Sequence, residues 1–195
     1  MKYAQRFESI TVVTAPVTEP LSLAEIKANL GIDDDAYDVA LTRLRATARQ
    51  YCEKVQRRAF ITQTLDVTYN LPLTRLILPR PPLQSVTSIK YLDTDGVEQT
   101  LDSAYYRVTG TDPGLITLAE GYSWPSVQPV EEPVTVRIVA GYGDDQYVPQ
   151  TTKGAMLALI GHWLENREAA LAGQTVTAVP FQLESLITMD RDLYF

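Results

Sequence analysis

The sequence predicts an α+β fold: a small helical bundle with an inserted antiparallel β domain, sandwich-like or barrel-like, and an extended C-terminal arm. Residues 33–58 and 149–171 repeat apolar residues every three or four positions, the period of an amphipathic helix. Between them, from Ile61 to Gly141, the apolar period falls to two, as in strands. Each flanking helix needs a partner for its apolar face, so we expect the helices to pack together around the insertion.

The first helix is predicted by the segment "LSLAEIKANLG". Ser22 is followed three residues later by Glu25, the spacing of a capping box, in which each side chain satisfies a free backbone N–H group of the first turn. Gly31 can adopt the left-handed conformation that ends many helices. We therefore expect a short helix between these signals.

The second helix, over residues 33–58, has the strongest apolar stripe in the chain. Its members are Tyr37, Leu41, Leu44, Ala48, Tyr51 and Val55. Acidic residues stand at its start, and Lys54, Arg57 and Arg58 stand at its end. This arrangement complements the helix macrodipole and favours a helix of about five turns.

The middle region reads as six or seven short strands. The segments "TLDVTYN" and "VTVRIVA" alternate apolar and polar residues. Turn signals separate the strands, namely the prolines at 79, 81 and 82, Asp95-Gly96, Asp112-Pro113-Gly114 and Trp124-Pro125. We predict a hairpin turn at "DTDG" and a strand that leads into a turn at "AGYGDD".

The last long helix has a wide apolar face. Its members are Thr152, Ala155, Met156, Leu159, Ile160, Trp163 and Leu164. The small and polar residues that follow it predict a linker into the closing segment "VPFQLESLITMDRDLYF". The predicted boundaries are 20–60 with 148–172 for the helical bundle, 61–147 for the β domain, and 173–195 for the linker and arm.

Composition indicates a globular protein, because 45% hydrophobic and 21% charged residues are ordinary values for one. A net charge of -7 disfavours a surface that grips nucleic acid throughout, because such binding needs Lys and Arg. The single cysteine, Cys52, excludes an intramolecular disulfide and is expected in the core. No apolar run approaches the roughly 18 residues that span a bilayer, so we expect no membrane contact and a cytoplasmic origin.

Few residues suggest chemistry. His162 lacks the second histidine one turn away that zinc proteases use, and the glycines of "AGYGDD" match neither nucleotide-binding motif. We therefore expect no catalytic, metal-binding or cofactor-binding residues. Two alternatives stay open: a small metal-dependent hydrolase that uses the acidic clusters at 33–35 and 144–145, and a DNA-binding regulator that uses the basic second helix.

An ordered set of segments along the chain resembles a known family. The segments are "LSLAEIKANLGI", "ARQYCE", "LPRPPLQSVTSIKYLDTDG", "YYRV", "WP", "VRIVAGYG", "VP" at 148–149 and "HWLENRE". In this order they resemble the head-tail connector proteins of tailed bacteriophages, in particular the adaptors with a β domain inserted in a helical core, which also occur in phage-like gene transfer agents. The family commonly closes on a segment with a basic end, whereas this chain closes on acidic and aromatic residues.

The resemblance implies a structural virion protein that is not an enzyme and needs no cofactor. Such an adaptor is made in the bacterial cytoplasm and forms a homo-oligomeric ring, usually a dodecamer, under the portal protein at the head-tail junction. The ring extends the channel through which double-stranded DNA passes without specific binding, and it joins the head to a stopper or tail-completion protein. An acidic subunit suits this role, because it does not attract the phosphates of DNA during ejection.

Two interfaces are predicted from the residues and this resemblance. The C-terminal arm, in which "FQLESLI" can form about two helical turns, is expected to dock on the portal through apolar and aromatic side chains, namely Pro180, Phe181, Leu183, Leu186, Ile187, Met189, Leu193, Tyr194 and Phe195. The alternative is that this segment folds back on its own domain. The ring interface is expected on the basic half of the second helix, at Arg43, Arg45 and Arg49.

Overall fold

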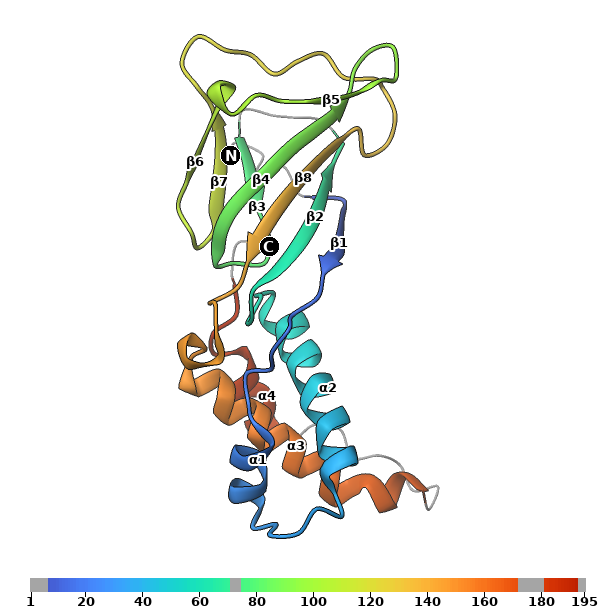
Figure 1. The fold of residues 1–195 in the computed structure, drawn as a ribbon, viewed down its shortest axis with the longest axis vertical. Helices are drawn as coiled ribbons and strands as arrows, with labels where there is room; N and C mark the ends of the chain where they lie inside the picture. Colours follow the sequence, from blue (N-terminus) through green and yellow to red (C-terminus); the bar gives the residue numbers. More distant parts are fainter. Residues whose placement is uncertain (1–6, 71–74, 172–180, 193–195) are drawn as a thin grey trace. The chain divides into compact units, whose positions relative to one another are not determined.

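The structure is a computed structural model that describes residues 7–70, 75–171 and 181–192, with the backbone alone for 167–171 and 181–182. Within these residues it contains four α-helices and two antiparallel sheets, which confirms the predicted α+β class. The described chain divides into two compact units (Figure 1). Residues 7–16 and 62–142 form the β unit, and residues 17–61 and 143–192 form the helical unit.

The larger sheet of the β unit has five antiparallel strands. Their order is β1 (Ser9–Thr14), β2 (Gln63–Tyr69), β8 (Val134–Ala140), β4 (Leu83–Leu92) and β5 (Glu98–Thr100). Every second residue of β2 and β8 is buried, as the alternating sequence predicted. One face of the sheet therefore contributes to a core, and the other face carries polar side chains.

A second sheet lies in the order β3 (Arg75–Leu78), β7 (Gly114–Leu118) and β6 (Tyr106–Thr109). The buried Tyr69 of the first sheet donates its hydroxyl hydrogen to the carbonyl of Ile77 in the second, at 2.9 Å. Burial raises the pKa of this hydroxyl, so it stays protonated and remains a donor. The two sheets thus share one core, consistent with the predicted sandwich-like insertion.

The turns of the β unit follow the sequence signals. In the β4–β5 hairpin, Asp93 Oδ1 accepts hydrogen bonds from the backbone N–H groups of Asp95 and Val97, and Gly96 has φ 80°. This confirms the predicted "DTDG" turn. After β8, Gly141 has φ 125°, which confirms the predicted strand exit.

Strand β1 was not predicted. Its segment "SITVVT" does not alternate apolar and polar residues, because Val12 and Val13 are adjacent and both are exposed. The strand forms by pairing with β2, where Ser9 lies opposite Thr68, and it makes one edge of the larger sheet. Tertiary pairing, not local pattern, therefore determines this element.

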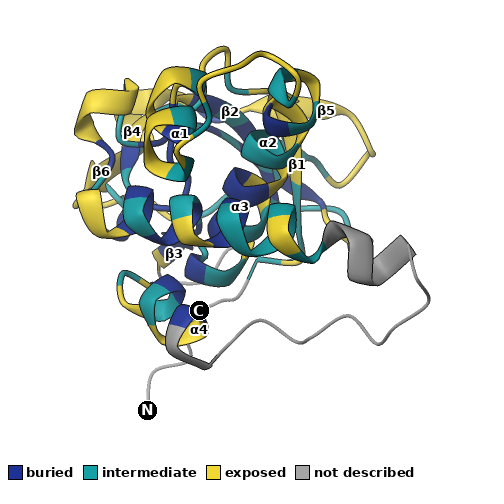
Figure 2. Ribbon diagram, turned by 90° about the horizontal axis from the view of Figure 1, so that it is seen from below, coloured by how far each residue is buried: buried dark blue, intermediate teal, exposed yellow. Residues whose placement is uncertain are grey.

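The helical unit packs α1 (Leu23–Leu30), α2 (Asp38–Gln56) and α3 (Gln150–Leu171), as the apolar stripes predicted. Buried positions on these helices are dark blue in the view from below (Figure 2), and the core residues include Ile26, Leu41, Ala48, Met156, Leu159 and Ile160. The predicted capping box is present, since Glu25 N–H donates to Ser22 Oγ at 3.1 Å and Ser22 N–H donates to Glu25 Oε2 at 2.7 Å. Gly31 caps α1 with φ 67°.

Helix α2 begins at Asp38, five residues later than the sequence predicted. The Asp34 carboxylate accepts a hydrogen bond from the backbone N–H of Ala36, and Lys27 of α1 pairs with both Asp35 and Asp38. Aspartate side chains that bond to nearby backbone favour a turn over a helix. The acidic run therefore forms the α1–α2 connection.

Residues 181–192 contain the two helical turns that the sequence predicted, but they pack on the helical unit and do not form the predicted extended arm. They contain helix α4 (Phe181–Thr188), which packs against α3 and α2 and buries Leu183 and Ile187. Two 3-10 helices complete the described elements, η1 (Ser103–Tyr105) in the β unit and η2 (Asp145–Tyr147) in the helical unit.

Candidate functional site

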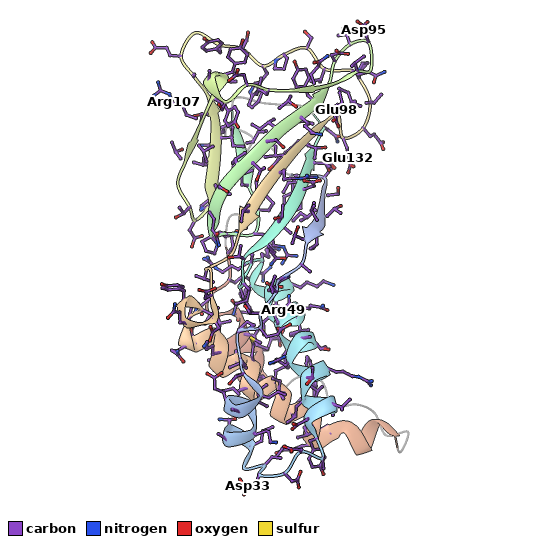
Figure 3. All side chains as sticks on the ribbon, in the orientation of Figure 1. Asp33, Arg49, Asp95, Glu98, Arg107 and Glu132 are labelled. Carbon is purple, nitrogen blue, oxygen red and sulfur yellow. The ribbon has the colours of Figure 1, made fainter. Side chains whose placement is uncertain are left out.

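Arg49 of α2 makes two ion pairs inside the helical unit (Figure 3). It is 8% exposed, and its guanidinium pairs with Glu19 at 2.8 Å and with Glu53 at 2.9 Å. Glu53 also accepts a hydrogen bond from the backbone N–H of Phe60 at 2.9 Å. Burial disfavours the charged guanidinium, but the two carboxylates outweigh it and hold the pKa of Arg49 above its usual value. The charge of Arg49 is thus satisfied inside its own chain.

The other two arginines of the predicted ring interface differ in exposure. Arg45 is half-buried, and its guanidinium donates to the backbone carbonyl of Leu21 at 3.2 Å. Arg43 is exposed on the outer side of α2. The structure therefore brings Arg45 and Arg49 toward the segment before α1 and leaves Arg43 facing solvent.

The partners of Arg49 were missed by the sequence analysis, which treated charged residues as exposed. One signal was available, because Arg49 and Glu53 are four residues apart, the spacing of a helical ion pair. Nothing local to the sequence indicated Glu19, which lies 30 residues earlier.

A buried polar residue of α2 holds helix α4 in place by hydrogen bonds. Gln56 is 0% exposed, and its amide nitrogen donates to the carbonyl of Ile187 at 2.9 Å. Its backbone carbonyl accepts from the N–H of Asp192 at 2.8 Å, and its amide oxygen accepts from Thr152 Oγ1 at 3.3 Å. Arg58 adds a bond of 2.6 Å to the carbonyl of Asp190. These contacts attach the segment to the end of α2, and Thr151 and Thr152 of α3 attach it to α3 by donating to the Asp190 carboxylate.

The predicted docking residues are divided by this packing. Leu183 and Ile187 are buried within the helical unit, Leu186 is half-buried, and Met189 is 68% exposed. Pro180, the side chain of Phe181, Leu193, Tyr194 and Phe195 lie outside the described residues. Leu183 and Ile187 therefore serve the fold, and docking through the other residues stays a prediction.

The polar face of the larger sheet carries a paired charge network. Arg137 of β8 makes two hydrogen bonds to Asp66 of β2, at 2.7 and 2.8 Å, and Lys90 of β4 pairs with Glu98 of β5 at 2.7 Å. The hydrogen bonds from Arg137 lower the pKa of the Asp66 carboxyl. A cavity of 190 Å³ lies among these side chains, but both cations already have carboxylate partners.

The residues considered for chemistry lie apart or are already bonded. Among the described residues, no group of three or more His, Cys, Asp and Glu side chains is placed to hold a metal ion. The side-chain amide nitrogen of Asn166 donates to His162 Nδ1 at 3.2 Å and to the His162 backbone carbonyl at 2.8 Å, within α3. Cys52 is buried, as predicted, and burial raises the pKa of its thiol to about 12.

The chain resembles known proteins at the level of structure. No family model matches the chain, and no curated protein matches it by sequence. Across the described helices, none is long and apolar enough to cross a membrane.

Three solved structures share the fold over nearly the whole chain. A chain in the neck of an empty gene transfer agent (GTA) particle, computed with C6 symmetry, matches with a TM-score of 0.77 and 23% identity. A chain in the virion of a native GTA particle matches with a TM-score of 0.75 and 23% identity. A chain in the neck of a native GTA particle, computed with C12 symmetry, matches with a TM-score of 0.74 and 22% identity. Each match covers 96% of this chain and 97% of the other.

Proposed function

We propose that this protein is a structural head-tail connector, an adaptor subunit that forms a ring under the portal of a phage or gene transfer agent. The ring extends the DNA channel and joins the head to a stopper or tail. The subunit acts through its surfaces and is not an enzyme. Its place is the head-tail junction of the virion.

The observation that carries this proposal is the structural match to chains from GTA necks over 96% of this chain and 97% of the other. Two of those necks were computed with C6 and C12 symmetry, which supports a ring of six-fold or twelve-fold order. A subunit in such a ring presents two different surfaces to its neighbours, because a head-to-tail contact is heterologous. We propose a ring of twelve copies.

The proposed portal contact uses the exposed part of the C-terminal segment. Met189 is an exposed apolar side chain on the segment that Gln56 anchors, and the docking residues outside the described part of the chain continue from it. A contact made by a few apolar side chains binds one copy weakly. Twelve copies on one portal bind strongly together, because each bound subunit raises the effective concentration of the next contact.

Deletion of the gene from its phage or gene transfer agent tests the function. The proposal predicts DNA-filled heads and free tails that fail to join, and joining restored by the added purified protein. Heads that join tails normally without the protein would rule out the connector role. Electron microscopy of the lysate distinguishes the two outcomes.

A further inference from the structure

The outer face of α2 carries basic and polar residues with no charged partner of their own. Arg43, Thr47, Gln50 and Lys54 follow one another at intervals of four, three and four residues, so they share one face of the helix, and all four are exposed. Among the described residues, neither Arg43 nor Lys54 makes an ion pair, although the chain has 24 acidic and only 17 basic residues. We call this surface the basic α2 face.

The helix macrodipole does not explain this face. A cation is stabilised by the dipole within the last turn of a helix, which accounts for Lys54. Arg43 stands in the second turn of a helix that begins at Asp38, where the dipole gives a cation no benefit. An acidic surface outside the subunit would complement both charges.

A surface of opposite character lies at the turn that leads into α3. Asp144, Asp145, Gln146 and Tyr147 are all exposed, and Tyr147 is 63% exposed. We call these four residues the acidic η2 turn. Exposed tyrosines are enriched at the energetic centres of protein interfaces, where a rigid aromatic ring is buried at small entropic cost.

The acidic η2 turn is held in one conformation. Val148 is 2% exposed and anchors the turn in the core, and its backbone N–H donates to the carbonyl of Asp145 at 3.2 Å. Lys153 of α3 is buried and lies 3.8 Å from the Asp145 carboxylate. The carboxylate of Asp144 has no ion pair within the described chain. A surface fixed in this way can bind without first becoming ordered.

In the helical unit, the ribbon of α2 lies toward the right of the view and the orange turn that leads into α3 lies at the left (Figure 1). A closed ring needs two complementary, separate surfaces on each subunit. We propose that neighbouring copies of this chain join by seating the acidic η2 turn of one copy on the basic α2 face of the next. This inference rests on the proposed connector function and moves the predicted ring interface from Arg45 and Arg49 to the outer side of α2.

Crosslinking between engineered cysteines tests the contact. We expect the K54C/D144C variant, treated with a short bis-maleimide, to give a ladder of covalent oligomers on portal-bearing heads. K54C or D144C alone should give no ladder, because a heterologous contact keeps like positions apart. The native Cys52 adds little background, since it is buried and its thiol pKa is raised to about 12.

A K54C/E98C variant, which moves one cysteine to the exposed Glu98 of the β unit, is the matched control. Rings that form on heads while K54C/D144C crosslinks no more than this control would overturn the proposed contact and leave the connector function intact. Failure of the wild-type chain to form any ring on heads would overturn both.

A charge exchange provides a second, independent readout. We expect Lys54→Glu or Asp144→Lys alone to weaken each subunit contact about two- to fivefold, the range measured for exposed ion pairs. The double variant K54E/D144K should recover most of the loss. Single variants that assemble as well as the wild type, or a double variant as defective as the sum of the two, would contradict the pairing.

Discussion

The side-chain amide of Gln56 donates a 2.9 Å hydrogen bond to the backbone carbonyl of Ile187, a residue 131 positions later in the chain. Both residues are buried, at 0% and 1% exposure. The bond attaches α4 to the end of α2 and fixes the backbone two residues before Met189, the exposed apolar residue of the proposed portal contact. A single polar side chain in the core thus connects folding to the proposed assembly surface.

Replacing Gln56 with alanine should destabilise the protein by about 1–3 kcal/mol, because the carbonyl of Ile187 and the hydroxyl of Thr152 lose a buried partner. Urea unfolding measures the change. Gln50→Ala, on the exposed side of the same helix, should stay within about 0.5 kcal/mol of the wild type. Equal effects at the two positions would show that the Gln56 contacts add nothing.

Ile187→Ala should destabilise by about 2–5 kcal/mol, since it leaves a cavity where α4 meets the long helices. Met189→Asp should leave the melting temperature nearly unchanged, because Met189 is 68% exposed. It should instead reduce attachment to portal-bearing heads. A Met189→Asp variant that attaches like the wild type would contradict docking through this residue, and an Ile187→Ala variant of wild-type stability would contradict the seating of α4.

Much of the helical unit could be predicted from the sequence, because local signals specify it. The capping box at Ser22 and Glu25 and the apolar stripes of α2 and α3 all appear as expected. The predicted start of α2 was wrong. Asp34 bonds to the local backbone and Asp35 pairs with Lys27, so these residues form a turn and not the first turn of the helix.

The rest of the site depends on contacts that no local pattern contains. Burial of Arg49 requires its partner Glu19, which lies 30 residues away. The packing of α4 requires Gln56, a polar residue that is not part of the predicted apolar stripe. A period-based analysis assigns polar residues to the solvent side, so it misses polar groups that the fold buries in pairs. Strand β1 was missed for a related reason, since it forms only by pairing with β2.

Arg49→Leu should destabilise the protein by about 3 kcal/mol or more, because it removes the buried guanidinium that pairs with the carboxylates of Glu19 and Glu53. Arg43→Leu removes an exposed charge of the same kind and should change stability by less than about 0.5 kcal/mol. Thermal unfolding of the two variants checks this difference. If Arg49→Leu were as stable as Arg43→Leu, the ion pairs would not support the helical unit.

Acid should weaken the β unit through Asp66. Its folded pKa lies below its usual value because Arg137 donates to it, so the unfolded chain binds the proton more readily than the folded one. The contribution is therefore complete above the unfolded pKa of about 4 and is lost as the pH falls through the lower folded value. Unfolding free energies measured from about pH 5 downward should fall less steeply in Asp66→Asn than in the wild type. Identical slopes would contradict this contribution.

The central claim is that the protein forms a ring at the head-tail junction, and a cryo-electron microscopy reconstruction of purified particles tests it most directly. The connector function predicts twelve copies of this chain in a single ring between portal and tail. Particles that lack the protein, or that carry it away from the portal vertex, would contradict the claim.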